Sequence, residues 1–118
     1  MSKPISLQRG VSMTTLYRIE KEVILEPSYR GKGILPICET FDKKSIEEVL
    51  AVKGCEQVRV YYGMESDLTI HAILVAVDAK GQDILPASHF SVQEEEPYLW
   101  DDAARCPDIC PPDSPLNS

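Results

Sequence analysis

Residues 55–85 read CEQVRVYYGMESDLTIHAILVAVDAKGQDIL, and this stretch carries most of the aliphatic, β-branched and aromatic residues that a core needs. Alternation of residue types predicts a strand over 58–63. Its two faces are expected to carry Val58, Val60 and Tyr62 on one side and Arg59 and Tyr61 on the other. A turn over 64–67 then leads into a second predicted strand over 68–77.

The second strand is apolar on both faces over 73–77. Such a run is typical of a central strand that is covered on both sides. Asp78 and Gly81 predict a bulged hairpin turn, because the aspartate side chain caps the turn and glycine accepts a positive φ. A shorter third strand over 82–85 is expected to return from this turn and to stop at Pro86.

A short helix over 45–53 is expected just before the hairpin. Ser45 and Glu48 form a capping box at its start. Gly54 follows its end, where a residue in the left-handed region is favoured. A helix of this length has to pack on the sheet to be stable.

A second helix is expected over 14–25, where apolar residues recur at helical spacing. A strand over 18–25 is the competing interpretation, because the β-branched residues near its end favour extended structure. Pro27 ends the element in either case. Residues 1–13 have no clear period and contain a proline and a glycine, so we expect a flexible leader there.

The amino-acid composition of the chain changes after the third predicted strand. Residues 87–93 are typical of a weak strand or a loop, and the acids at 94–96 before Pro97 predict a helix start. One or two helical turns are then expected over 98–105. The last segment, 106–118, holds too many prolines for a regular helix or a central strand.

These elements predict an α+β fold, with an antiparallel sheet of three to five strands and one or two helices packed on one face. The antiparallel arrangement follows from the short connections, because a parallel pair needs a crossover of about a dozen residues or more. At 118 residues the chain has the length of one domain. We expect a single domain over 14–105, between the leader 1–13 and an irregular Cys/Pro-rich tail over 106–118 that packs on the domain.

Charge is distributed unevenly along the chain. Residues 1–60 carry ten Lys or Arg and eight Asp or Glu, a net charge of +2. Residues 61–118 carry two cations and eleven acids, a net charge of −9, which brings the whole chain to −7. A half this acidic repels phosphate backbones, which argues against a nucleic-acid partner. An acidic surface of this kind suits either solubility alone or a basic protein partner.

The sequence predicts neither a membrane span nor a signal peptide. The longest apolar run, 72–77, has six residues, far below the ~18–20 of a membrane helix. The first residues contain no apolar stretch of the kind that a secretory signal needs. The cytoplasm is therefore the expected compartment, and no membrane partner is expected.

Three strings suggest a group of proteins. VRVYYG at 58–63, LVAVDAKGQDIL at 74–85 and CPDICPPDSPLN at 106–117 together resemble a group of small uncharacterised bacterial proteins. The resemblance covers roughly residues 45–118 and leaves residues 1–44 outside it. It implies that the hairpin and the Cys/Pro tail belong to one unit, and it implies no function.

The candidate metal ligands are the four cysteines, Cys38, Cys55, Cys106 and Cys110. Four thiolates suit tetrahedral zinc, although zinc sites usually have two close pairs and here only Cys106 and Cys110 are close. The same pair also suits a disulfide or a redox-active dithiol. In the fourth interpretation Cys38 and Cys55 are buried as small apolar residues, and the tail thiols are packed or free.

Three functional classes follow from the sequence. The leading one is a non-enzymatic protein-interaction module of the immunity, inhibitor or adaptor type, which binds a basic protein or self-associates through a sheet edge. The second is a small metal-stabilised or redox domain that uses Cys106 and Cys110. The third is a small enzyme around His71 and Tyr61, but no Ser or Cys lies at a motif spacing that would make His71 part of a triad; His89 is the other histidine. We therefore assign no catalytic or cofactor-binding residue.

Overall fold

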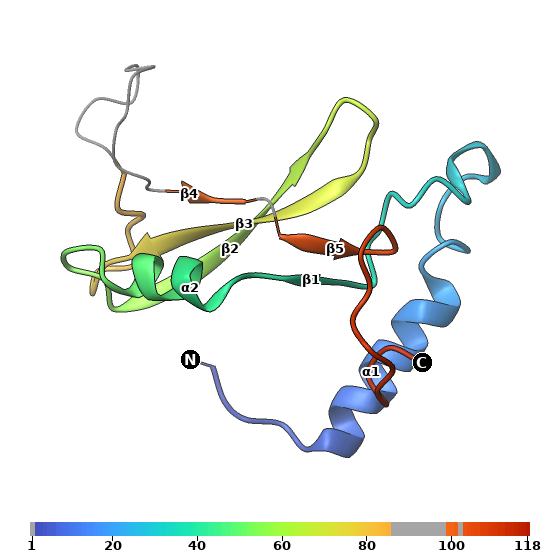
Figure 1. Ribbon diagram of the computed structural model, residues 1–118, viewed down its shortest axis with the longest axis horizontal. Coiled ribbons are helices and arrows are strands. Elements are labelled where there is room, and N and C mark those ends of the chain that lie inside the picture. Colours follow the sequence, from blue (N-terminus) through green and yellow to red (C-terminus); the bar gives the residue numbers. More distant parts are fainter. Residues whose placement is uncertain (1, 86–98, 102) are drawn as a thin grey trace.

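The computed structural model describes residues 2–85, 99–101 and 103–118. Its elements form the α+β fold that the sequence predicts, with two antiparallel sheets, β2-β3-β4 and β1-β5 (Figure 1). In chain order the elements are α1 (Leu7–Glu20), the 3₁₀ turn η1 (Pro27–Tyr29), β1 (Cys38–Thr40), α2 (Lys43–Leu50), β2 (Gln57–Met64), β3 (Ile70–Val77), β4 (Leu99–Trp100) and β5 (Ala104–Cys106).

The β2–β3 hairpin is the centre of the larger sheet. Its register pairs Gln57 with Val77 and Met64 with Ile70, which confirms the two strands predicted for this stretch. β4 pairs with the other side of β3, so β3 is the central strand. The second half of β3 is buried, in agreement with its doubly apolar run.

The turn after β3 is built around Asp78, as predicted. The Asp78 side chain accepts hydrogen bonds of 2.8 and 3.0 Å from two backbone N–H groups of the turn, those of Lys80 and Gln82. Gly81 has a φ of 81°, a conformation that costs glycine little. The third strand predicted over 82–85 is shorter than expected, because only Val77 and Asp83 form a bridge.

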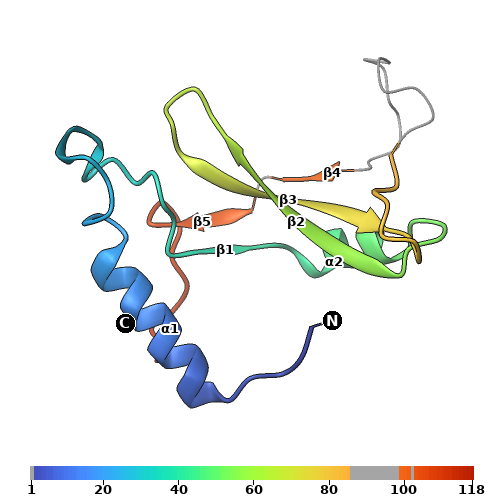
Figure 2. The same ribbon diagram turned by 180° about the vertical axis from the view of Figure 1, so that it is seen from behind.

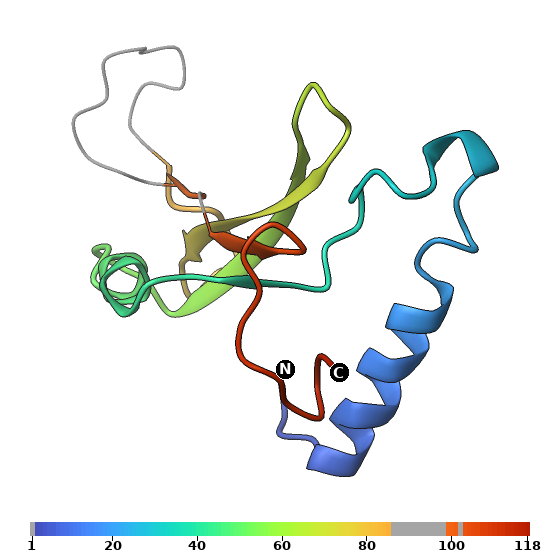
Figure 3. The ribbon, with the colours of Figure 1, turned by 45° about the vertical axis from the view of Figure 1, so that its right-hand side comes forward.

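α2 packs on one face of the larger sheet and closes the core there (Figure 3). Val49 of α2 is fully buried against Leu74, Ala76 and Trp100. Partly buried neighbours surround this cluster: Phe41, Val52, Cys55 and Ile84. Burying one such aliphatic side chain contributes about 1.5–3 kcal/mol, which is what holds so short a helix in place.

The start of α2 differs from the prediction. The helix begins two residues before Ser45, the predicted N-cap, and Asp42 occupies the N-cap position. Glu48, which was expected to complete the capping box, instead accepts a hydrogen bond from Trp100 Nε1 at 3.4 Å. Trp100 of β4 thus binds the Glu48 side chain that a capping box would have used. Gly54 does adopt the predicted left-handed conformation, with a φ of 88°.

α1 begins seven residues earlier and ends five residues earlier than the helix predicted over 14–25. Residues 7–13 are therefore helical, where a flexible leader over 1–13 was expected. The Ser6 hydroxyl caps the start by accepting a hydrogen bond from the Arg9 N–H at 3.0 Å. Periodicity missed the first two turns of this helix because its apolar residues lie on all sides and none of them is buried.

α1 does not cover the larger sheet. Figures 1 and 2 show it beyond the β1–β5 pair, beside the C-terminal segment. The Tyr17 hydroxyl donates to Pro36 O at 2.6 Å, and Arg18 donates to Leu116 O at 2.5 Å. α2 is thus the one described helix on the sheet face. Within the described ranges, no helix has the length and apolar character needed to cross a membrane.

The β1–β5 sheet was not predicted. Its register pairs Cys38 with Cys106, Glu39 with Arg105 and Thr40 with Ala104. The helical turns predicted over 98–105 are wrong, because β4 and β5 occupy this stretch and obtain their backbone hydrogen bonds from β3 and β1. The predictions for 87–93 and 94–97 fall outside the described residues. The segment after β5 is irregular, as expected from its prolines.

Candidate functional site

The outer edge of β2 has no paired strand in the part of the chain that the structure describes. The hydrogen bond from Glu65 N–H to Thr69 C=O, at 3.0 Å, marks a bonded pair of the antiparallel ladder. Because such pairs alternate along a ladder, residues 57, 59, 61 and 63 bond β3. The outward-facing backbone groups therefore belong to Val58, Val60, Tyr62 and Met64.

The side chains of these four residues are exposed and mostly apolar. Their exposed fractions are 40% for Val58, 46% for Val60, 78% for Tyr62 and 60% for Met64. β2 contains neither proline nor lysine, two residues that commonly protect an edge strand from pairing. This eight-residue edge is a ready template for an added strand.

The opposite edge of the sheet is filled, so among the described residues only the β2 side of this sheet lacks a partner. Ile70 N–H donates to Ile34 O at 2.8 Å, at the start of β3. Ala76 O accepts from Ile84 N–H at 2.9 Å, at the other end. β4 pairs between these two points.

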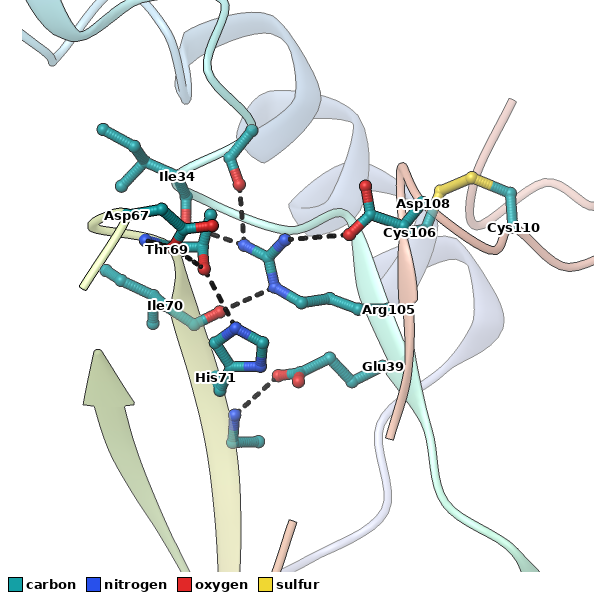
Figure 4. Close-up of polar contacts among 12 residues, drawn as sticks. Ile34, Glu39, Asp67, Thr69, Ile70, His71, Arg105, Cys106, Asp108 and Cys110 are labelled. Carbon is teal, nitrogen blue, oxygen red and sulfur yellow. Dashed lines mark hydrogen bonds and ion pairs between the residues drawn. A yellow bond between two sulfur atoms is a disulfide. The ribbon is translucent and has the colours of Figure 1, made fainter. Parts of the chain in front are cut away.

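Glu39 and Arg105 complete that filled edge with their side chains (Figure 4). Glu39 Oε2 accepts from Ala72 N–H at 2.8 Å, and Arg105 Nε donates to Ile70 O at 2.8 Å. Arg105 Nη2 also donates to two carbonyls of the loop before β1, at 2.7 and 2.9 Å. Arg105 is only 4% exposed, and its Nη1 lies 3.8 Å from the exposed Asp108. This cation joins the two sheets.

Sequence reasoning missed both of these residues. Arg105 is one of only two cations in the acidic half 61–118, so a signal for a special role was present. Glu39 gives no comparable signal, because it lies in a stretch of mixed polar and apolar residues. Their shared role becomes visible only once β1 and β5 are paired.

The one cation on β2 is neutralised within the chain. Arg59 Nη1 lies 2.6 Å from Asp83 Oδ1, and the Tyr61 hydroxyl donates to the other oxygen of the same carboxylate. The Tyr61 hydrogen bond, followed by Arg59, lowers the pKa of Asp83 below its usual value. Glu56 and Glu65, both exposed, flank the strand at its two ends. The edge therefore has a net negative charge.

His71 lies on β3 within a short polar chain (Figure 4). Its Nε2 is 2.9 Å from Thr69 Oγ1, and the Thr69 hydroxyl donates to Asp67 Oδ1 at 2.6 Å. Hydrogen bonds from the Thr69 hydroxyl and N–H lower the pKa of Asp67. Gly63 lies directly opposite His71 in the hairpin, and the Tyr61 hydroxyl bonds Asp83 instead of His71. The other histidine of the chain lies outside the described residues.

The structure joins Cys106 and Cys110 in a disulfide and leaves Cys38 and Cys55 as thiols. Cys38 is the partner of Cys106 in the β1–β5 ladder. Cys55 lies in the turn between α2 and β2, where its thiol donates to Gln57 O at 3.4 Å. Of the four interpretations of these residues, the structure contains the disulfide. It does not assemble a four-thiolate zinc site, because two of the sulfur atoms are bonded to each other.

Two further observations bear on these cysteines. Among the described residues, no group of three or more His, Cys, Asp or Glu side chains is placed to hold a metal ion. Disulfides persist mainly in oxidising compartments, whereas the sequence led us to expect the cytoplasm. The cytoplasmic location stays a prediction.

Comparisons of the chain with protein-family models, with curated proteins and with solved structures found no match. The resemblance to small bacterial proteins therefore stays a prediction. Function has to be inferred from the geometry and charge of the chain itself.

Proposed function

We propose that this chain is a non-enzymatic protein-interaction module, whose β2 edge binds an extended, basic segment of a partner protein as an added strand. The observation that carries this proposal is the row of outward-facing backbone groups at Val58, Val60, Tyr62 and Met64, on the strand edge that no other described residues pair with, together with their exposed side chains. Strand addition obtains its affinity from such main-chain hydrogen bonds, and alternate side chains supply the specificity.

The charge of the edge favours a basic segment. Arg59 is paired with Asp83, so it does not repel an incoming cation. Glu56 and Glu65 are exposed at the ends of β2, where lysine or arginine side chains of an added strand would reach them. The net charge of −7 on the chain also steers a basic partner toward it.

Self-association through the same edge is less favourable. Two copies could pair through their β2 strands in an antiparallel arrangement that leaves each face of the combined sheet continuous. Such an arrangement places Val60 opposite Val60 of the second copy, or Tyr61 opposite Tyr61. In both registers Glu56 of one copy lies one position from the residue opposite Glu65 of the other, so the two side chains point to opposite faces of the sheet. The repulsion comes instead from the net charge of −7 that each copy carries, and a basic strand avoids it.

The proposed mode of binding suits a protein that acts by docking, such as an inhibitor, an immunity protein or an adaptor subunit. The partner would contribute backbone hydrogen bonds at alternate residues and cations near the two flanking glutamates. No catalytic group is needed for this role.

A fluorescent peptide of eight alternating lysine and valine residues tests the proposal. We expect saturable binding, measured by anisotropy, that weakens about tenfold between 0.1 and 1 M NaCl, because the screening length falls from about 10 to about 3 Å. A matched peptide of alternating glutamate and valine is expected not to bind. Sedimentation of the protein alone shows in parallel whether it self-associates, and a stable dimer that excludes the peptide would contradict the proposal.

Two variants locate the binding to the edge. Val60→Pro removes one outward N–H without removing a ladder bond to β3, so it should abolish peptide binding and leave the fold intact. Val60→Lys changes no backbone group and should weaken binding by adding a like charge. Val60→Thr keeps the N–H and serves as the control. Equal affinity in all three variants would show that the peptide binds elsewhere.

A further inference from the structure

Three cysteines meet at the β1–β5 sheet. Cys38 lies directly opposite Cys106, and Cys106 is bonded to Cys110. The neighbouring pair, Glu39 and Arg105, turns toward β3, so Cys38 and Cys106 share the other face of the two-stranded sheet. A free thiol thus lies beside one sulfur of a disulfide.

The spacing of this pair suits a disulfide bond. Opposed residues of an antiparallel ladder have Cα atoms about 4.5–5.5 Å apart, inside the range of about 4.4–6.8 Å that disulfides accept. Cys106 is 3% exposed, whereas Cys38 is half-buried and Cys110 is exposed. The Cys106 sulfur is therefore shielded from solvent thiols, and Cys38 is its neighbour within the fold.

We propose that Cys38, Cys106 and Cys110 form a thiol–disulfide exchange site. The Cys38 thiol loses its proton to solvent, and its thiolate attacks Sγ of Cys106. The bond between Cys38 and Cys106 forms as the bond between Cys106 and Cys110 breaks. Cys110 leaves as a thiolate and takes up a proton from solvent. Each state holds one disulfide and one thiol among the three residues, so the step needs no external oxidant or reductant.

The two states differ in what they hold together. The bond between Cys106 and Cys110 closes a turn with a sequence separation of four. The bond between Cys38 and Cys106 would link β1 to β5 covalently and close a much longer loop. Cys110 would then present a thiol on the surface, in the irregular segment that follows β5. This site is independent of the β2 edge.

Mass spectrometry of the non-reduced chain tests the exchange. The protein is incubated without reductant, quenched with acid, alkylated with N-ethylmaleimide and digested with trypsin. Peptide 33–43 contains Cys38, and peptide 106–118 contains both tail cysteines. We expect a product in which the two peptides are cross-linked through Cys38 and Cys106, with the alkyl label on Cys110. The product should appear faster at pH 8.5 than at pH 6, because the thiolate is the attacking species.

Variants separate this exchange from random scrambling. Cys38→Ser should abolish the cross-linked product. Cys55→Ser should leave its yield unchanged, since Cys55 lies in the turn between α2 and β2 and not in the β1–β5 sheet. In Cys110→Ser, treatment with oxidised glutathione should yield the bond between Cys38 and Cys106. This last variant provides a test even if Cys38→Ser fails to fold. A wild-type chain that keeps only the bond between Cys106 and Cys110 at pH 8.5 would overturn the proposal, as would cross-links that involve Cys55 equally.

Discussion

Glu39 and Arg105 are partners in the β1–β5 ladder, and both side chains bond the backbone of β3. Glu39 accepts from Ala72 N–H, and Arg105 donates to Ile70 O, two residues away on the same edge. A pair of side chains thus takes the place of a paired strand at this edge of the larger sheet. The edge is closed there, whereas no strand among the described residues pairs with the outer edge of β2.

Arg105 should be the most sensitive single position for stability. Arg105→Ala leaves the carbonyls of Gly33 and Ile70 without this donor, and Ile34 O keeps only the Ile70 N–H. We expect the free energy of unfolding to fall by about 2–6 kcal/mol, because each of the two buried carbonyls left without a donor costs about 1–3 kcal/mol. Urea denaturation followed by circular dichroism measures this change.

A matched surface variant provides the control for this prediction. Lys43 and Glu47 form an exposed pair at 3.7 Å on α2, and such pairs contribute little. Lys43→Ala should therefore change the free energy of unfolding by less than about 0.5 kcal/mol. A similar effect in both variants would show that Arg105 does not join the two sheets.

His71 should carry its proton on Nε2 when it is neutral. The single proton of the Thr69 hydroxyl is donated to Asp67, so Thr69 accepts from His71 Nε2–H. Long-range nitrogen–proton correlation spectra distinguish the two tautomers directly. Thr69→Val removes the acceptor and should redistribute the proton between Nδ1 and Nε2. A wild-type imidazole with its proton on Nδ1 would contradict this assignment.

The lowered pKa of Asp83 predicts the pH dependence of the contacts on β2. A group whose pKa is lower in the folded protein stabilises it above the ordinary aspartate pKa of about 3.9 and loses that effect as the pH falls through the folded value. Asp83→Asn should lower Tm at pH 7, and the difference from wild type should narrow below about pH 4. A difference that is equal at pH 7 and pH 3 would count against this account.

Tyr61 can be tested separately, because its hydrogen bond is the main cause of the lowered pKa of Asp83. Tyr61→Phe keeps the ring and the edge strand and removes only the hydroxyl. We expect carboxyl carbon NMR titrations to show a higher pKa for Asp83 in this variant than in wild type. An unchanged pKa would assign the shift to Arg59 instead.

The hairpin could be predicted because its signals are local. Alternation over 58–63, the doubly apolar run before Asp78 and the glycine after it all fall within one stretch, and the structure agrees with each. The fold class followed from these elements, because short connections leave the antiparallel arrangement as the simplest one.

The wrong predictions concern segments whose structure depends on contacts with residues that are distant in the sequence. Trp100 pairs with β3 and bonds Glu48, which replaces both the helical turns and the capping box that local patterns favoured. β1 and β5 are too short to be recognised separately, and only their pairing places Glu39 and Arg105 at the edge of β3. The start of α1 depends on one cap at Ser6, with no apolar stripe to mark its first two turns.

Amide hydrogen exchange along β2 tests the docking edge most directly. In the free protein the N–H groups of Val58, Val60 and Tyr62 should exchange rapidly, whereas those of Arg59 and Tyr61 should be protected by β3. Adding the lysine–valine peptide should protect the first set and leave the second set as it was. If the outward amides stay unprotected at saturating peptide, or are already protected in the free protein, β2 is not the docking edge.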